Sequence, residues 1–235
     1  MSQQIYHLLS GAWPLVAENR ILSGVTPEEM DELWSTGWRH FGPDFFRASL
    51  MSDGVCLKRQ IPLRIRVASF RQSRSQRRTG RKNADLRVVF SEANPGRAEE
   101  NLFHLHKIRF GENVPESLGD FLGAGPDEYP CSYQQLSVYL GQKLIAVSFM
   151  ALGYRASSSI YAVFDPEFSC RRLGIYTMLA ELTFAKAHDM EFHYIGYATM
   201  EPSCYDYKKQ FGPLEYYDWE GQWLNGENLR QVSQS

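Results

Sequence analysis

Residues 135–197 read QLSVYLGQKLIAVSFMALGYRASSSIYAVFDPEFSCRRLGIYTMLAELTFAKAHDMEFHYIGY, and this stretch decides the fold. Its apolar pattern predicts strands at 135–140, 144–152, 159–164 and 192–197 and a helix over 173–188. Gly141 and Gln142 join the first two strands as a tight hairpin. The order of hairpin, strand, helix and strand predicts an α+β domain around a mostly antiparallel sheet.

The N-terminal half carries a second set of elements. We expect helices at 26–36 and 95–110 and strands at 61–67 and 86–90. Thr26, Pro27 and Glu29 form a helix start, with a capping residue, a proline at the first helical position and a capping-box acid. Residues 111–130 hold four glycines and three prolines, which is typical of a long loop or a connection between domains. The sequence therefore predicts a smaller α/β domain at 1–110 and a larger domain at 111–235.

Composition bounds the class of protein. The 235 residues are 43% hydrophobic and 14% aromatic, which is enough for a packed core. The sequence has no apolar run long enough for a membrane span, and its first residues lack the order of a signal peptide. Four dispersed cysteines, Cys56, Cys131, Cys170 and Cys204, form no Cys-x-x-Cys pair. We expect a cytoplasmic protein without membrane contact, metal or cofactor.

The charge is strongly polarised. Eleven of the 25 basic residues lie between Lys58 and Arg87, beside one acid, Asp85. The remaining residues hold 14 basic and 26 acidic side chains, so a net charge of −2 conceals a basic block in an acidic protein. Such polarity predicts a polyanion bound at one place, with a solvated helix face as the alternative interpretation.

The basic block combines a strand with a helix. In the strand at 61–67 apolar residues alternate with Arg64 and Arg66, which points the arginines to the other face. The segment that follows is weakened as a helix by Gly80. If it is helical, spacings of three and four place one set of arginines on one side: Arg71, Arg74, Arg78 and Arg81.

Ordered motifs along nearly the whole chain resemble the arginyl/leucyl-tRNA–protein transferase family, and its bacterial leucyl-transferring branch more than its eukaryotic arginyl branch. The N-terminal motifs are Gly37-Trp-Arg39, Pro62-Leu-Arg-Ile65, Phe70-Arg-Gln-Ser-Arg-Ser-Gln-Arg-Arg78 and Asn83-Ala-Asp-Leu86. The C-terminal motifs are Phe164-Asp-Pro-Glu-Phe168, Arg171-x-Leu-Gly174-x-Tyr176, Tyr194-Ile-Gly-Tyr197, Cys204-Tyr-Asp-Tyr-Lys208 and Phe211-x-Pro-Leu-Glu215.

The resemblance implies a GNAT-like acyltransferase fold and an aminoacyltransferase activity. Leucine or arginine would pass from tRNA to the α-amine of an acceptor, most simply a protein that begins with Asp or Glu and is thereby marked for degradation. Aminoacyl-tRNA is an activated ester, so the enzyme needs to align the amine and stabilise the oxyanion rather than supply a nucleophile. Three alternatives stay open: a small-molecule or amino-acid acceptor, an acyl-CoA N-acyltransferase, and a tRNA-binding protein without activity. Tyr176 and the basic block count against coenzyme A.

The resemblance also assigns the site. It places the aminoacyl-adenosine end of the donor at Arg171, Gly174 and Tyr176, where backbone N–H groups and the arginine meet phosphate. It gives Tyr197, Tyr207 and Lys208 the catalytic positions. Tyr197 would orient the ester or relay a proton, unless it packs in the core, and Lys208 would pair with an acceptor carboxylate, unless it is exposed and unpaired. The residues that would bind tRNA phosphates are Arg71, Arg74, Arg77, Arg78, Arg81 and Lys82.

The chain departs from the family at the N-terminus. The family's domain begins with Cys-x-Tyr, where this chain has Gly11-Ala12-Trp13, and it has close cysteines where this chain has only Cys56. Because Gly11, Leu57 and Gln60 offer no thiolate, a metal or iron–sulfur site is not expected there. These differences do not change the expectation that the donor is an aminoacyl-tRNA. They do weaken the expectation that the acceptor is a protein.

Overall fold

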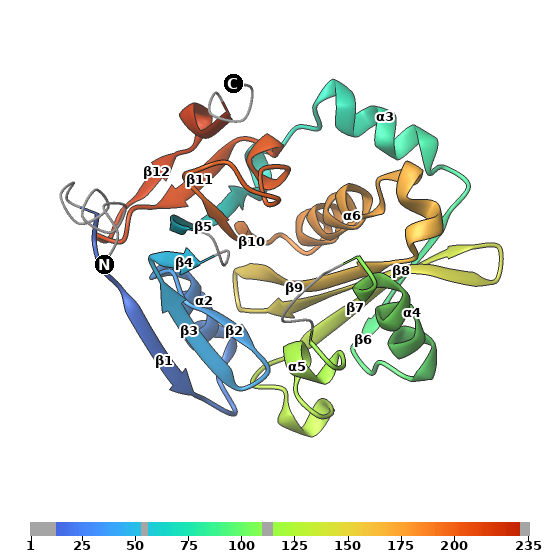
Figure 1. Ribbon diagram of the computed structural model, residues 1–235, viewed down its shortest axis with the longest axis horizontal. Helices are drawn as coiled ribbons and strands as arrows, with labels where there is room; N and C mark the ends of the chain where they lie inside the picture. The colour runs from blue at the N-terminus through green and yellow to red at the C-terminus, as the bar shows by residue number, and fades with distance from the viewer. Residues whose placement is uncertain (1–12, 53–55, 110–114, 231–235) are drawn as a thin grey trace.

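The computed structural model describes residues 13–52, 56–109 and 115–230. Within them a nine-stranded sheet forms the centre of the molecule (Figure 1). Eight strands follow the spatial order β12 (Trp223–Asn225), β11 (Leu214–Tyr217), β5 (Leu57–Arg66), β10 (Phe192–Thr199), β9 (Ala156–Phe164), β8 (Lys143–Leu152), β7 (Tyr133–Leu140) and β6 (Arg87–Glu92). The ninth, β4 (Leu50–Ser52), pairs with β5.

The strand pairs are antiparallel except for one. β10 runs parallel to β9, while β6–β7, β7–β8, β8–β9, β5–β10 and β5–β11 are antiparallel. The predicted α+β class with a mostly antiparallel sheet is therefore confirmed. The predicted hairpin is also present, and Gly141 adopts the positive φ of 60° that its turn requires.

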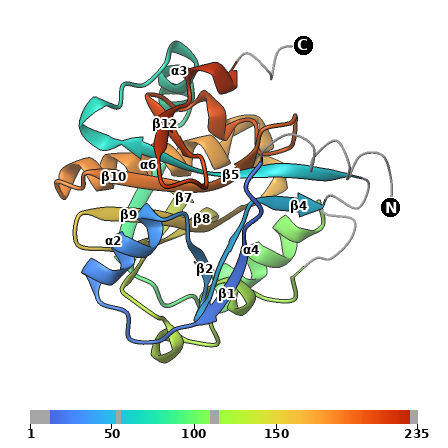
Figure 2. The same cartoon turned by 90° about the vertical axis from the view of Figure 1, so that its left-hand side faces the viewer.

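Helices cover both faces of the large sheet. α6 (Leu173–Ala187) packs on β7 to β10, and α3 (Arg74–Lys82) packs on α6. α4 (Arg97–Lys107) contacts β8 and β9 from the opposite face, where α5 (Gly119–Leu122) also lies. Figure 2 shows α3 and α6 on one side of the sheet and α4 on the other.

A small second sheet stands against the α4 face. It comprises β1 (Ala17–Ile21), β3 (Asp44–Ala48) and β2 (Arg39–Phe41), and α2 (Pro27–Ser35) precedes β2. α2 begins at the predicted capping box of Thr26 and Glu29. Trp34 and Phe45 of this unit share one core cluster with Phe103 and Phe149 of the large sheet and α4. The small sheet is thus fixed against the large one by a common core.

The predicted domain boundary at residue 110 does not coincide with a break in the large sheet. β5 and β6 precede residue 110, yet they pair with β10 and β7, which follow it. A single cut in the sequence cannot divide this sheet into two parts, because strands that are distant in sequence pair with each other in it. The predicted loop at 111–130 likewise contains α5 and a 3₁₀ turn at Pro126–Glu128.

Candidate active site

The two central strands separate at one point of the sheet. β9 and β10 pair only between residues 156–158 and 192–194. Beyond that point β9 stays with β8, and β10 bulges between Tyr194 and Gly196 and stays with β5. Gly196 has a φ of 79°, a backbone conformation that side-chain-bearing residues rarely adopt. The separation leaves a gap between Ser159 and Gly196, which we call the strand gap.

Two cations from distant parts of the chain lie in the strand gap. Arg39 of β2 donates from Nη1 to the carbonyl of Ser159 (2.8 Å) and from Nη2 to that of Ile160 (2.7 Å). The ammonium of Lys208 donates to the carbonyl of Tyr197 (3.1 Å). A methyl group placed on Gly196 would meet Arg39 Nη1 at 2.7 Å and Lys208 Nζ at 3.1 Å. Gly196 is therefore required by the close approach of both cations.

The strand gap perturbs the pKa values of its residues. Desolvation and, second to it, the neighbouring Arg39 charge lower the pKa of Lys208 to about 7. Desolvation also lowers the pKa of Arg39. Burial, followed by the charge of Glu181, raises the pKa of Tyr207 to about 12. Near neutral pH the Lys208 amine therefore exchanges between its charged and neutral forms, while the Tyr207 phenol keeps its proton.

The loop that carries Lys208 is anchored by its own buried ion pair. Lys209 is 1% exposed and lies 2.7 Å from Asp206. The second carboxylate oxygen of Asp206 accepts from the backbone N–H of Ser203 (3.2 Å). Tyr205 and Tyr207 flank these residues and are each 38% exposed. The two adjacent lysines therefore lie in different environments. Lys209 is buried in an ion pair with Asp206, whereas Lys208 faces the strand gap.

A buried polar network lies where the two strands part. Glu181 of α6 accepts hydrogen bonds from Ser148 and Ser159, and its carboxylate lies 3.2 Å from His193 Nε2. Ser157 Oγ lies 2.9 Å from the other ring nitrogen of His193. Glu181 is 1% exposed and His193 fully buried. The network ties α6 to β8, β9 and β10 at the last paired residues, which fixes where the strands diverge.

Of the predicted catalytic residues, the structure brings Tyr207, Lys208 and the backbone of Tyr197 together at the strand gap. The Tyr197 hydroxyl is otherwise engaged, because it donates to the carbonyl of Gly37 (2.5 Å) and, at 3.5 Å, to that of Phe46. Tyr197 is buried, and burial raises the pKa of its phenol. Its side chain holds the small sheet against β10, so the predicted orientation of an ester by this hydroxyl finds no support in the geometry.

The predicted adenosine-binding residues form a separate group at the start of α6. Arg171 pairs with Asp85 through two hydrogen bonds of 2.8 and 2.9 Å. A methyl group on Gly174 would meet only the Phe164 ring, at an ordinary 3.7 Å, so no close backbone approach is required there. Tyr176 is half-buried against an apolar cluster that includes Leu136. Their predicted contact with the donor remains an expectation.

The predicted basic helix exists and presents its cations to solvent. A capping box of Ser73 and Gln76 begins α3, which offsets the weakness expected from Gly80. Gln76, Thr79 and Asn83 form its buried face against α6. The predicted tRNA-binding side chains are all exposed: Arg71, Arg74, Arg77, Arg78, Arg81 and Lys82.

Other members of the basic block are neutralised within the fold. Arg59 pairs with Glu201 at 2.6 Å, and Arg64 pairs with Glu215 at 2.6 Å. Arg66 lies 3.3 Å from Glu191. In the described part of the chain none of the arginines of α3 forms an ion pair with a carboxylate. The free positive charge of the block is therefore concentrated on α3.

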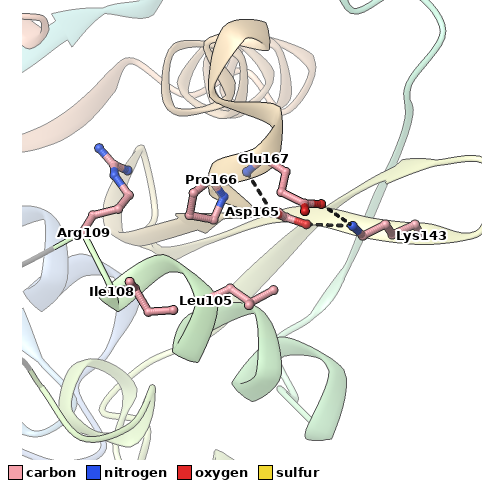
Figure 3. A pocket seen from close by; sticks show the side chains of 7 residues that line it. All are labelled: Leu105, Ile108, Arg109, Lys143, Asp165, Pro166 and Glu167. Atoms are coloured by element: carbon pink, nitrogen blue, oxygen red, sulfur yellow. Dashed lines mark hydrogen bonds and ion pairs between the residues drawn. The ribbon is translucent and has the colours of Figure 1, made fainter.

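A cavity of about 360 Å³ lies at the far end of β9, between α4 and the turn before α6 (Figure 3). Its lining residues are Leu105, Ile108, Arg109, Lys143, Asp165, Pro166 and Glu167. Lys143 pairs with Asp165 at 2.8 Å and with Glu167 at 3.4 Å, so these charges satisfy one another. None of the lining residues belongs to the strand gap.

The described residues contain no group of three or more His, Cys, Asp or Glu side chains that could hold a metal ion. Cys56 is half-buried, and Gly11, one of the positions that offer no thiolate, lies outside the described residues. The expected absence of a metal remains a prediction. No helix among residues 13–52, 56–109 and 115–230 is long and apolar enough to span a membrane.

Sequence reasoning missed two parts of this site. Arg39 stands in the quoted motif Gly37-Trp-Arg39, but nothing in its local pattern places it between β9 and β10. Glu181 carries a usable signal, because it is an acid on the buried side of an otherwise apolar helix. Buried acids need partners, and three strands supply them here.

The comparisons with known proteins agree on one group. The model of a family described as "Arginine-tRNA-protein transferase, C terminus" matches residues 98–218. An aspartate/glutamate leucyltransferase of Campylobacter jejuni is 30% identical over 205 residues, covering 84% of this chain and 83% of that protein. A protein of the same name from Marinobacter nauticus is 30% identical over 78% of this chain and 77% of its own length.

Among solved structures, FemX has a TM-score of 0.45 at 11% identity and covers 86% of this chain and 70% of its own. The structure of L-PGS from Bacillus licheniformis has a TM-score of 0.43 at 15% identity, with coverage of 73% and 50%.

Proposed function

The chain belongs to the arginine-tRNA-protein transferase family, and on that premise we propose that it transfers leucine from leucyl-tRNA to the α-amine of a protein that begins with Asp or Glu. The family description would also fit arginine as the transferred group. Leucine is favoured because the relatives that match most of the chain are named as leucyltransferases acting on aspartate and glutamate. Such a transfer would mark the acceptor for degradation.

One observation carries the proposal. Two cations lie at the gap between the central strands, and the phenol of Tyr207 is close enough to act on the charge of Arg39. No serine, cysteine or histidine nucleophile is needed there, because the ester of aminoacyl-tRNA is already activated. The protein has to hold the ester and the amine together in the geometry of attack.

The reaction is a direct displacement. The neutral α-amine of the acceptor attacks the ester carbonyl carbon, the new C–N bond forms, and the bond from that carbon to the ribose oxygen breaks. The amine loses one proton, and the ribose oxygen of the tRNA gains one. An α-amine has a pKa of about 7.7–8.0, so a substantial fraction is already neutral near pH 7.

The donor tRNA would approach from the α3 side. The exposed arginines of α3 match a phosphate backbone, and α3 is held directly against the turn before α6. Lys82 donates to the carbonyl of Cys170 (2.7 Å), and Asn83 donates to that of Arg171 (2.9 Å). A tRNA bound on α3 would therefore have a fixed position relative to the β9–α6 connection, where the sequence motif expects its 3′ end.

The test is a transfer assay with defined partners. Purified protein is incubated with leucyl-tRNA, arginyl-tRNA or acetyl-CoA and with peptides that begin with Asp, Glu or Ala, and products are identified by mass spectrometry. Addition of one leucine to the Asp and Glu peptides from leucyl-tRNA is expected. Transfer from arginyl-tRNA alone would change the donor, whereas transfer only from acetyl-CoA would refute the proposal.

A further inference from the structure

The strand gap lacks a negative charge. A methyl group on Gly196 would lie 2.7 Å from Arg39 Nη1 and 3.1 Å from Lys208 Nζ, yet the two cations donate hydrogen bonds to the uncharged carbonyls of Ser159, Ile160 and Tyr197. Among the residues that the structure describes, no carboxylate forms an ion pair with either cation.

Other shielded cations of this fold do have a carboxylate. Arg64, with a side chain 12% exposed, pairs with Glu215, and Arg171, 19% exposed, pairs with Asp85. Lys209, directly after Lys208, is 1% exposed and pairs with Asp206. Shielded cations are stable in a protein when an anion compensates them. Arg39 and Lys208 differ from these three described cations, because neither forms an ion pair with a described carboxylate.

Glu181 does not fill this need. Its carboxylate is fully engaged, because it accepts from Ser148 and Ser159 and lies beside His193. Its charge acts on Lys208 and Arg39, but it forms no ion pair with either. No carboxylate of residues 13–52, 56–109 and 115–230 therefore supplies the missing anion.

We propose that Arg39 and Lys208 form the binding site for the side-chain carboxylate of the acceptor's first residue. The inference rests on the proposed function and adds the residues that select the acceptor. The side chain of an N-terminal Asp or Glu branches from the carbon that carries the α-amine. A carboxylate held at the strand gap therefore also brings the attacking amine to the place where the ester is expected.

The local geometry suits a carboxylate. The two hydrogen bonds from Arg39 to β9 orient its planar guanidinium, which keeps further N–H donors available, and Lys208 has three donors. Gly196 has no side chain, so none stands between this part of the backbone and the ligand. Tyr205 and Tyr207, each 38% exposed, flank the two cations, and Lys208 Nζ lies 5.2 Å from the centre of the Tyr205 ring.

The experiment compares acidic and isosteric neutral acceptors. Peptides that differ only in their first residue, Asp against Asn and Glu against Gln, are assayed for kcat/KM with wild-type protein, Lys208→Gln and Arg39→Gln. Loss of one charge-assisted contact lowers kcat/KM for the Asp and Glu peptides by about 10- to 100-fold. The Asn and Gln peptides change by much less, so the Asp/Asn ratio collapses toward one.

Arg155→Gln is the matched control, because it also removes one arginine charge, at an exposed position paired with Glu191 and remote from the strand gap. It leaves the Asp/Asn ratio unchanged. Arg39 joins β2 to β9, so Arg39→Gln is interpreted only if its thermal unfolding matches that of the wild type. If the thermal unfolding of Arg39→Gln differs from that of the wild type, Lys208→Gln alone provides the test.

The outcomes separate the two proposals. If wild-type protein transfers leucine to no peptide, the proposed function fails. If the wild type transfers leucine and Lys208→Gln slows the Asp and Asn peptides equally, the cations act on the developing oxyanion and the inference is overturned. Unchanged discrimination in both variants overturns it as well.

Discussion

Arg171 and Asp85 are joined by two parallel hydrogen bonds of 2.8 and 2.9 Å, and this ion pair ties the end of α3 to the start of α6. Arg171 Nη1 also donates to the carbonyl of Lys82 (3.3 Å). The basic helix and the glycine-containing turn, which are 86 residues apart in sequence, are therefore one structural unit. This relationship changes what substitution of Arg171 is expected to do.

We expect Arg171→Gln to weaken tRNA binding several-fold, with little change in turnover at saturating leucyl-tRNA. Without the ion pair, α3 loses one of its fixed contacts to α6, and its phosphate-binding arginines are less well placed. Filter binding and single-turnover kinetics measure the two quantities, and Asp85→Asn should reproduce the effect. A large fall in turnover with unchanged tRNA affinity would instead place Arg171 at the transferred group.

Simultaneous replacement of Arg74, Arg77, Arg78 and Arg81 by Gln should abolish most of the salt dependence of tRNA binding. Each phosphate contact contributes about 0.7–0.9 to the slope of log K against log salt, so the slope should flatten by roughly 3. All four side chains are exposed, and the fold should persist. A control that replaces Arg64, already paired with Glu215, should alter the slope little. An unchanged slope in the fourfold variant would make α3 only a solvated face.

The adjacent lysines should respond to substitution in opposite directions. Lys208→Gln is expected to raise the melting temperature, because it removes a desolvated cation that lies beside Arg39. Lys209→Gln should destabilise the fold by roughly 3 kcal/mol, because it leaves Asp206 without its buried partner. Thermal unfolding of both variants at pH 7 provides the comparison. Destabilisation by Lys208→Gln would show that Lys208 has a structural role.

The pH dependence of kcat/KM for the acceptor should report Lys208. The folded-state pKa of Lys208 is lowered to about 7, so its cation is present below that pH and lost as the pH rises through it. If the cation binds the acceptor, kcat/KM should fall on the alkaline side with this pKa, against the rise from deprotonation of the acceptor amine. Lys208→Arg should move the alkaline fall far upward. A profile identical to that of the wild type would exclude titration of Lys208 as its cause.

Glu181→Gln should shift that alkaline fall to lower pH. The Glu181 carboxylate raises the pKa of Lys208, so its removal leaves the cation easier to deprotonate. The amide keeps the size of the side chain and its acceptor oxygen for Ser148 or Ser159. A merely structural role would change stability without moving the profile, so the two readouts are measured together.

Local sequence patterns were sufficient to predict the helices and strands of this protein. Four features each depend on residues close in sequence: the alternation at β5, the hairpin at Gly141, the capping box of α2 and the motif that begins α6. Each is present, although β5 begins at Leu57 rather than at the predicted residue 61. The α+β class and the family likewise follow from the order of these motifs, because the order survives whatever packing the chain adopts.

The site could be predicted only in part, because it is assembled across the chain. Tyr207 and Lys208 lie at the strand gap as the motif indicates, but Arg39 comes from a strand about 120 residues before the carbonyls that it binds. The sequence likewise does not reveal that the Tyr197 hydroxyl bonds to Gly37 or that Arg171 is paired with Asp85. Each of these contacts depends on the register of distant strands.

The sequence by itself therefore determined the elements, their order and the family, since those follow from local periodicity and short motifs. Tertiary structure alone decided which cations are free and which are neutralised. Arg64 and Arg66 form ion pairs with Glu215 and Glu191, which follow them by more than 100 residues in sequence. The described arginines of α3 form no such pair, and Arg39 and Lys208 lie together without a described anion. The reason is physical: the effect of a charge depends on its distance to other charges and to water, and folding sets both.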